Sequence, residues 1–501
     1  MKHWRTWFWL GGVAGLAILL GWRQPAGAQP IAKSDATEAC LACHTEATPG
    51  IVADWEKSRH GLTTPRDAKQ IKGLGLKVSA PEIPAELAAN SVGCAECHLA
   101  NPEQHADSFE HNGYRVHTVV TPTDCAGCHS QEVDQYRLNL MSAAYGNLMN
   151  NAVYRDLMKS INGDQKLVKG RLETTDADDL TRADSCLSCH GTKVEMTGLG
   201  NRETEFGAMM LPQFTGWPNN GVGRENPDGS KGSCAACHTR HQFSMELARK
   251  PDTCGQCHSG PDVPAYKVYK ASKHGNQYAS LNGDWNFQTV PWVVGRDFNT
   301  PTCAVCHVSL ITSTEGSVIA RRSHQMTDRL PWRIFGLIYS HPQPKEPDTS
   351  RLKNAAGLPL PTDFNGGLAA TGLIDTGEQD RRRATMQNVC LGCHSRNWVD
   401  GHWSRFERAI ATADAMTHTA TEVMQQIWSH KLAKGPAQQA SPFDEAVEKT
   451  WIEQWLFFGN SVRYSAAMMG ADYGVFDNGR WYQSKNLLEL KSWLDLHQRR
   501  K

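Results

Sequence analysis

The residues of this sequence best suited to chemistry are its cysteines and histidines, which number 16 and 21 in 501 residues. All sixteen cysteines fall into eight copies of one five-residue pattern, Cys-x-x-Cys-His, which we number motifs 1 to 8 in chain order. Their residues are Cys40, Cys43 and His44; Cys94, Cys97 and His98; Cys125, Cys128 and His129; Cys186, Cys189 and His190; Cys234, Cys237 and His238; Cys254, Cys257 and His258; Cys303, Cys306 and His307; and Cys390, Cys393 and His394.

This pattern is the attachment signature of c-type haem. Two thiols three residues apart on one helical turn can bond the two vinyl groups of a porphyrin, and the next residue then places an imidazole on the iron. Disulfides and paired Cys-x-x-Cys zinc sites are the alternatives. Neither explains why a histidine follows the second cysteine all eight times, or why no cysteine is left over. The sequence therefore predicts eight covalently bound haem c groups.

Thirteen histidines lie outside the motifs, and an iron with two imidazoles transfers electrons whereas one with a single imidazole can bind substrate. Two segments resemble each other: Trp55 to Gly61 and Tyr269 to Gly275 both place an aromatic residue three positions before Ser-basic-His-Gly. We predict that their histidines, His60 and His274, are second axial ligands. His241 lies three residues after His238, so these two rings are expected to bind different haems packed closely together.

The N-terminus is typical of a secretory signal. Basic residues precede the apolar run from Trp7 to Leu20, and Ala26-Gly27-Ala28 is a small-residue cleavage site, so residues 1–28 are predicted to be removed. The alternative is an uncleaved anchor helix. Lys plus Arg equals Asp plus Glu at 52 each, which gives no indication of nucleic acid as a partner. We expect an exported, periplasmic protein without a later membrane span.

The elements that must position these residues are predicted to be mainly α-helical, because no sustained alternation of apolar and polar residues indicates strands. Residues 29–400 are expected to form a haem-binding domain with little strand, and residues 401–501 a C-terminal bundle of long helices that mediates oligomer contacts. The first of these helices spans 403–432 with an apolar stripe, the second starts at Ser441-Pro442 and runs through Trp451 and Trp455, and the third starts near Ser484.

The sequence resembles the octahaem hydroxylamine oxidoreductase family. The resemblance rests on eight such motifs followed by a helical tail, and on four specific segments: 234–244 (CAACHTRHQFS), 248–251 (ARKP), 254–262 (CGQCHSGPD) and 272–275 (SKHG). It implies a mostly helical multihaem protein, usually a homotrimer, with seven electron-transfer haems and one catalytic haem. The catalytic haem would be that of motif 4, with His190 as its proximal ligand and the far side of the iron open.

The resemblance also implies the distal ligands of the other haems. Matching histidines are His60, His111, His241, His274, His324 and His418, with His117 as the alternative to His111. A seventh is expected between motifs 3 and 4, but no histidine lies between His129 and His190. Met141 lies near the expected position, and methionine ligation would raise the haem potential. The alternative is that Met141 only packs and that His402 or His430 takes its place.

Two departures from the family bear on the reaction. The family's catalytic pocket carries an Asp-His pair after motif 6, but here Asp262 is followed by Val263, so the proton-relaying imidazole is lost. A tyrosine near the C-terminus cross-links the catalytic haem of a neighbouring subunit in the oxidising members, and Tyr473 lies in that region, either in this role or as an ordinary contact residue.

These departures favour reduction of nitrite or hydroxylamine to ammonium at motif 4, with Asp262 orienting and delivering protons. Hydroxylamine oxidation is the alternative on the same scaffold, and a non-catalytic electron conduit is the alternative of a different class. The expected electron partner is a small cytochrome c or a quinol-linked membrane cytochrome.

Overall fold

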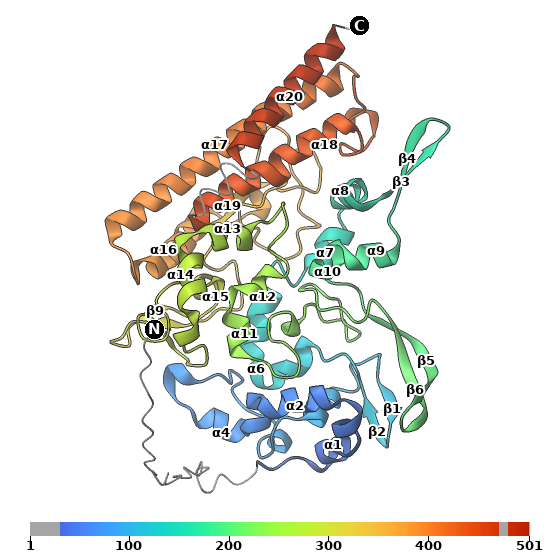
Figure 1. Cartoon of the computed structure of the whole chain (residues 1–501), viewed down its shortest axis with the longest axis vertical. Helices are drawn as coiled ribbons and strands as arrows, with labels where there is room; N and C mark the ends of the chain where they lie inside the picture. The colour runs from blue at the N-terminus through green and yellow to red at the C-terminus, as the bar shows by residue number, and fades with distance from the viewer. Residues whose placement is uncertain (1–30, 470–478, 500–501) are drawn as a thin grey trace, which may run out of the picture.

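The computed structural model describes residues 31–469 and 479–499. The predicted signal segment 1–28 and Tyr473 lie outside the described residues. Within the described ranges, no helix is both long and apolar enough to cross a membrane. Short N-terminal helices lie at one end of the molecule and the long C-terminal helices at the other (Figure 1).

Short helices separated by loops form the motif-bearing part. They are α1 (Asp35–Ala47), α2 (Pro49–Lys57), α3 (Arg59–Leu62), α4 (Pro65–Gln70), α5 (Cys94–His98), α6 (Pro122–Arg137), α7 (Ala144–Met149), α8 (Ala152–Asn162), α9 (Asp179–Asp184), α10 (Cys186–His190), α11 (Met245–Arg249), α12 (Pro251–Gly255), α13 (Ala265–Ala271), α14 (Lys273–Leu281), α15 (Cys303–His307) and α16 (Thr376–Leu391). Single 3₁₀ turns add η1 (Gly73–Gly75), η2 (Ala85–Leu87), η3 (Cys234–Ala236), η4 (Asn282–Asp284) and η5 (Ala370–Gly372).

The motifs themselves lie on helical turns, as their spacing requires. Motifs 2, 4 and 7 are the one-turn helices α5, α10 and α15, whereas motifs 1 and 3 lie within the longer helices α1 and α6. Motif 5 begins on η3, and motifs 6 and 8 begin within α12 and α16. Each Cys-x-x-Cys pair therefore presents both thiols from one turn, which fits thioether attachment to a single porphyrin.

Strands form only small sheets in the described ranges. The antiparallel pairs are β1 (Phe109–His111) with β2 (Tyr114–Val116), β3 (Asp164–Val168) with β4 (Arg171–Thr175), β5 (Glu195–Thr204) with β6 (Gly207–Thr215), and β10 (Trp332–Arg333) with β11 (His341–Pro342); β7 (Trp292–Val293), β8 (Ile311–Thr312) and β9 (Val318–Ala320) form a three-stranded sheet. The β5–β6 hairpin lies at the edge of the molecule (Figure 1) and was not predicted, because its mixed sequence lacks a regular apolar face.

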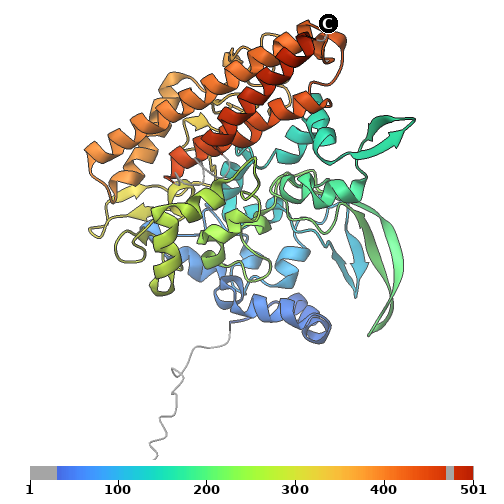
Figure 2. The ribbon, with the colours of Figure 1, turned by 45° about the horizontal axis from the view of Figure 1, so that its top comes forward.

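The C-terminal layer is built on α17 (Arg396–Ser429), a helix of 34 residues. Its predicted apolar stripe is buried throughout, and Thr417, which interrupts that stripe, is buried as well. α20 (Arg480–Gln498) runs beside α17, as the orange and red helices in Figure 2 show. After η6 (Pro436–Gln438), α18 (Ala446–Ile452) and the π-helical turn η7 (Glu453–Gly459) pack on both α17 and α20, and α19 (Asn460–Met468) packs on α17. Trp451 and Trp455 are fully buried in this core.

Three predicted helix starts were wrong by a few residues. The first C-terminal helix begins at Arg396 rather than at Trp403. The second C-terminal helix begins at Ala446 rather than near Ser441, because the carboxylate of Glu448 accepts hydrogen bonds from the backbone N–H groups of Asp444 and Glu445 and so caps the helix at Glu445. The third begins at Arg480 rather than near Ser484. Both helices otherwise follow the predicted course.

Candidate haem-binding and substrate site

Several motif histidines are oriented by a hydrogen bond that leaves Nε2 free. The Nδ1 atoms of His98, His190 and His307 face the backbone oxygens of His117, Ala144 and Met326 at 2.8, 3.4 and 3.3 Å, and Nδ1 of His44 faces Oγ1 of Thr48 at 3.1 Å. A histidine that ligates a metal commonly donates its other ring N–H to such an oxygen, which fixes the tautomer. These rings are therefore prepared to bind iron through Nε2.

Five motif histidines face a second histidine at the spacing that an iron requires. Since metal–imidazole bonds are about 2 Å long, two rings on opposite sides of one iron have centres about 6 Å apart. The observed pairs are His44 with His111 (6.3 Å), His129 with His60 (6.3 Å), His98 with His241 (6.4 Å), His238 with His324 (6.5 Å) and His394 with His274 (6.2 Å). The rings of His238 and His241 face different partners, as the ligands of two different haems would.

The repeated Ser-basic-His-Gly segments have the same local structure in both places. Ser58 and Ser272 each begin a helix, and each Oγ accepts a hydrogen bond from the glycine N–H three residues on, at 3.0 and 3.1 Å. A Cβ on Gly61 or Gly275 would lie 2.6 or 2.1 Å from the carbonyl oxygen of the preceding aromatic residue. Glycine is therefore required at both positions, where the helix turns back closely on the preceding one.

The aromatic residue of each segment forms a hydrogen bond to the backbone just before a motif. Nε1 of Trp55 donates to the carbonyl of Val92 at 2.9 Å, two residues before motif 2. The hydroxyl of Tyr269 donates to the carbonyl of Pro301 at 3.0 Å, two residues before motif 7. The histidine of each segment faces the next motif along the chain: His60 faces His129 of motif 3, and His274 faces His394 of motif 8. One structural unit is thus used twice to hold a distal histidine.

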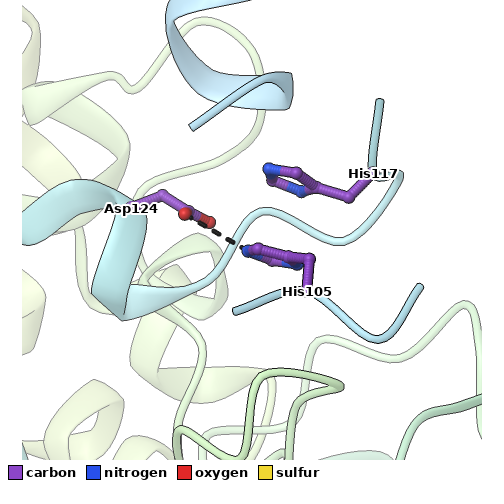
Figure 3. A group of neighbouring side chains, drawn as sticks. All are labelled: His105, His117 and Asp124. Atoms are coloured by element: carbon purple, nitrogen blue, oxygen red, sulfur yellow. Dashed lines mark hydrogen bonds and ion pairs between the residues drawn. The ribbon is translucent and has the colours of Figure 1, made fainter. Parts of the chain in front are cut away.

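His117, the alternative to His111, belongs to a separate buried network (Figure 3). Its ring stacks on that of His105 with centres 3.5 Å apart, and Nε2 of His105 lies 3.2 Å from Oδ1 of Asp124. Both ring nitrogens of His117 face backbone carbonyls, those of Val119 and Ala100. Burial lowers the pKa of His117, so the ring is neutral and only one of these nitrogens can donate to its carbonyl.

His105 completes this network between two carboxylates. Nδ1 of His105 lies 2.9 Å from Oδ1 of Asp107, and all three side chains of His105, Asp107 and His117 are buried. Burial lowers the pKa of His105, but the hydrogen bonds to Asp107 and Asp124 outweigh that effect and raise the pKa to about 9. His105 is thus a buried cation that neutralises two acids next to motifs 2 and 3.

One continuous cavity of about 2350 Å³ runs through the motif-bearing part. Its wall includes cysteines of motifs 2 to 8 and the motif histidines His129, His190, His238, His258, His307 and His394. Ordinary ligand pockets measure about 300–1,000 Å³. The apolar lining, the thiol pairs and the prepared imidazoles fit several porphyrins in contact.

Electrostatic effects between neighbouring thiols indicate the order of the motifs in space. Thiols that act electrostatically on each other join motifs 1 and 2, 2 and 3, 3 and 5, 5 and 6, 6 and 7, and 7 and 8. Motif 4 joins motif 6 through Cys189 and Cys257, and this interaction lowers the pKa of the Cys189 thiol to about 7. Seven motifs therefore form a line, and motif 4 is a branch near its middle.

The branch at motif 4 has a distinct polar environment. The ring of His190 is exposed to the cavity although protein surrounds it, and burial lowers its pKa. Burial lowers the pKa of both His190 and His258, and the charge of Asp262, which also lines the cavity, opposes this lowering. Asn460 holds the Asp262 backbone, donating to its carbonyl at 3.0 Å. The structure therefore brings the two predicted catalytic residues to one wall.

Sequence and structure comparisons identify the family. A model described as "Seven times multi-haem cytochrome CxxCH" matches residues 222–332, and one described as "Cytochrome c554 and c-prime" matches residues 124–210. A solved structure titled "Hypothetical multiheme protein" is 38% identical, with a TM-score of 0.88, and the match covers 93% of this chain and 96% of that one. This chain is a multihaem cytochrome c.

More distant relatives of this multihaem cytochrome come from Kuenenia stuttgartiensis. A "Probable nitrite reductase-hydroxylamine oxidoreductase fusion protein" is 23% identical over 419 residues, which is 81% of this chain but only 39% of that protein's length. The "reducing HAO-like protein complex Kustc0457/Kustc0458" is 19% identical with a TM-score of 0.61, covering 93% of this chain and 85% of that one, and shows the shared fold.

The remaining predicted axial ligands differ in burial and in their neighbours. Met141 lines the cavity, and its N–H donates to Asn139, whose side-chain amide in turn donates to the His324 carbonyl. His402 is buried in the cavity wall and stacks on Trp398. His430 is exposed at the end of α17. His418 is half-exposed, and its ring contact in the described part of the chain is Tyr339, so the structure does not bring it to a motif histidine.

The structure also reveals a histidine that sequence reasoning missed. His341 is buried, and its Nδ1 donates to the carbonyl of Pro342 at 2.7 Å. Its Nε2 has no hydrogen-bond partner among the described residues. A buried imidazole with this orientation is prepared to bind a metal, which makes His341 a further candidate axial ligand. No repeated pattern surrounds it in the sequence.

Proposed function

We propose that this multihaem cytochrome binds eight haem c groups and reduces nitrite or hydroxylamine to ammonium at motif 4. His190 has no facing histidine ring in the described part of the chain, which is also true of His258 and His307. The observation that carries the proposal is that motif 4 alone branches from the line of the other seven motifs, with Asp262 within electrostatic reach of His190. An iron with one imidazole keeps a position for substrate.

The arrangement of the motifs suits a reaction with many electrons. Nitrite takes up six electrons and eight protons to give ammonium and two water molecules. Haem iron with an open position supplies the site where nitrogen is bound and electrons arrive. Motif 4 branches from motif 6, so both arms of the line can deliver electrons to it.

Protons must arrive at the same place, and side chains of this chain can deliver them. Asp262 lines the cavity beside motif 4. A carboxyl group in such a position can accept a proton from water and pass it to the substrate, which contributes typically about 10²–10⁴-fold to a rate. The Ala144 carbonyl faces Nδ1 of His190, which would leave Nε2 free to bind the haem iron.

The relatives support the reaction class. Their printed names describe a probable nitrite reductase-hydroxylamine oxidoreductase fusion protein and a reducing HAO-like complex. The match covers about two fifths of the length of the fusion protein, so the activity of that whole protein is only proposed for this chain. Val263 also lines the cavity, where an imidazole would have relayed protons during oxidation.

Hydroxylamine oxidation is the second candidate function, because Tyr473 could form the cross-link of the oxidising members. Mass spectrometry of the denatured protein distinguishes the two. A haem peptide joined to Tyr473 favours oxidation, and steady ammonium production from nitrite with a reduced viologen donor favours reduction. Absence of both activities, together with no binding of cyanide or hydroxylamine, would favour a pure electron conduit.

Location and partners form part of the same proposal. We propose an exported, periplasmic protein that receives electrons from a small cytochrome c or a quinol-linked membrane cytochrome. A homotrimer is supported by large apolar residues exposed on α20, namely Trp481, Leu488 and Leu496. Light scattering of the purified holoprotein measures the oligomeric state, and a monomer would contradict this part.

A further inference from the structure

A hairpin that no other element covers projects from the motif-bearing part of the molecule. β3 and β4 pair along their whole length and are joined at Lys169 and Gly170. Both views show this hairpin standing clear of α17 and α20 (Figures 1 and 2). Every strand residue is exposed except Thr174, which is half-buried. An isolated two-stranded hairpin is marginally stable in water, so this one is expected to be covered in the working protein.

The two faces of the hairpin differ in polarity. Residues directly opposite each other in an antiparallel pair share a face, so Leu167 and Leu172 lie together on one face, with Gln165 and Thr174 two residues along. This leucine face carries no charge, and its leucines are 72% and 69% exposed. The charged strand residues all lie on the other face, and they are Asp164, Lys166, Arg171 and Glu173. The leucine face is therefore the one that lacks a covering layer.

The haems do not supply this cover. The cavity that fits the porphyrins is lined by Ile161 before the hairpin and by Asp179 after it, but by no residue from 162 to 178. The hairpin thus projects away from the cavity. The exposure of Leu167 and Leu172 therefore does not depend on whether the prosthetic groups are bound.

The base of the hairpin is joined to the segment that carries motif 4. A Cβ on Gly163 would lie 2.6 Å from the carbonyl oxygen of Thr175, so the two ends of the hairpin meet closely. The side-chain amide of Asn162 donates to Oγ of Ser185 at 2.9 Å, immediately before Cys186 of motif 4. A partner bound to the hairpin would therefore also hold the support of motif 4.

The same chain exposes a second apolar surface on α20. Trp481, Leu488 and Leu496 are all exposed, and their spacing of seven and eight residues places them on one face of the helix. Lys485 lies between them, and its charge is paired with Glu489 at 2.8 Å. This α20 stripe is about 22 Å long at 1.5 Å per residue. Strands of five residues are about 17 Å long, so the leucine face fits along it.

The chemistry of the hairpin favours a second copy of the chain over other partners. Binding to an anionic membrane uses an excess of basic residues beside the apolar ones. Here the two acidic and two basic strand residues cancel, and only Lys169 in the turn is left over. Encounter with a transient redox partner is steered by charge, whereas lasting contacts between copies of a chain are more apolar.

We infer that the leucine face of the β3–β4 hairpin docks on the α20 stripe of a second copy of this chain. This inference rests on the oligomer of the proposed function and names its surfaces. Because the two surfaces differ, each copy uses its hairpin on one neighbour and its α20 on the other. Such head-to-tail contacts can close into a ring, and a ring of three is the proposed homotrimer. Assembly then also holds the segment that carries motif 4.

The test measures self-association of the purified holoprotein by sedimentation velocity over a range of concentrations. Leu167→Ser on the hairpin and Leu488→Ser on α20 should each raise the dissociation constant about 10- to 100-fold, as expected for losing one buried leucine. The double variant should be weaker than wild type by much less than the product of the two factors, because both changes remove the same contact. Haem content should not change, since both leucines are exposed in the single chain.

Leu199→Ser is the matched control, because Leu199 is an exposed leucine on the other projecting hairpin, β5–β6. It should leave the dissociation constant unchanged.

Unchanged association in Leu167→Ser would overturn the inference while the proposed homotrimer stands, and weaker binding of that variant to phosphatidylglycerol vesicles would then assign the hairpin to a membrane. A loss in Leu167→Ser but not in Leu488→Ser, or fully multiplied losses in the double variant, would overturn the pairing of these two surfaces. A wild-type protein that stays monomeric would contradict the proposed homotrimer itself.

Discussion

The buried cation His105 gives a prediction whose size follows from the structure. Replacing it by leucine fills much of the same space but leaves Asp107 and Asp124 without the group that lies 2.9 and 3.2 Å from their oxygens. Asp124 keeps hydrogen bonds from Thr121 and Asn101, whereas Asp107 keeps only a long one from Val119. Removing one partner of a buried ion pair costs about 3–5 kcal/mol, so the free energy of unfolding should fall by about that amount in His105→Leu.

The pH dependence tests the same reasoning. The pKa of His105 is raised to about 9 in the folded protein, above its value of 6.5 in an unfolded chain. Its stabilising contribution is therefore fully present below about pH 6.5 and is lost as the pH rises through 9. Urea unfolding of the holoprotein followed by tryptophan fluorescence, at pH 6 and pH 9.5, measures both effects. The double variant His105→Leu/Asp107→Asn is the control and should recover part of the loss. A decrease of less than about 1 kcal/mol in the free energy of unfolding at pH 6 would refute the reasoning, because breaking a buried ion pair costs more than that.

Three further predictions concern the site and the C-terminal core. Asp262→Asn should reduce nitrite turnover by about 10²–10⁴-fold with an unchanged haem count by pyridine haemochrome assay, and equal activity would remove Asp262 from the mechanism. His274→Ala should open the iron of motif 8 and add one high-spin haem to the electron paramagnetic resonance spectrum, so an unchanged spectrum would contradict the pairing of His274 with His394. Burial raises the pKa of Glu448 to about 7, above its ordinary 4.5, so wild-type stability should fall between pH 4.5 and 7 and Glu448→Gln should lack this fall; parallel unfolding curves would argue against it.

Local spacing explains which parts of the site could be predicted. The motifs required one helical turn each, and the structure provides it. The Ser-basic-His-Gly repeat predicted that His60 and His274 share one structural device, because the capping serine, the glycine and the aromatic residue are all local. The long helix with its stripe was predictable for the same reason.

Contacts between distant segments explain what could not be predicted. Pairing of His98 with His241 joins residues 143 positions apart, and no local pattern records it. The place of His341 depends on its pairing with Arg333 between β10 and β11, two strands of two residues each, which no local pattern in the sequence indicates. The start of α18 is set by the hydrogen bond that the Glu448 carboxylate accepts from the N–H of Glu445. The Ser-Pro pattern at 441–442 predicted an earlier start.

The central claim is that the iron of motif 4 is open to substrate while the other irons carry two axial ligands. Counting high-spin ferric haems in the oxidised holoprotein by electron paramagnetic resonance, before and after adding cyanide, tests this most directly. The account predicts one high-spin haem among eight, converted to low spin by cyanide. A spectrum with no high-spin haem, or one that cyanide leaves unchanged, would contradict it.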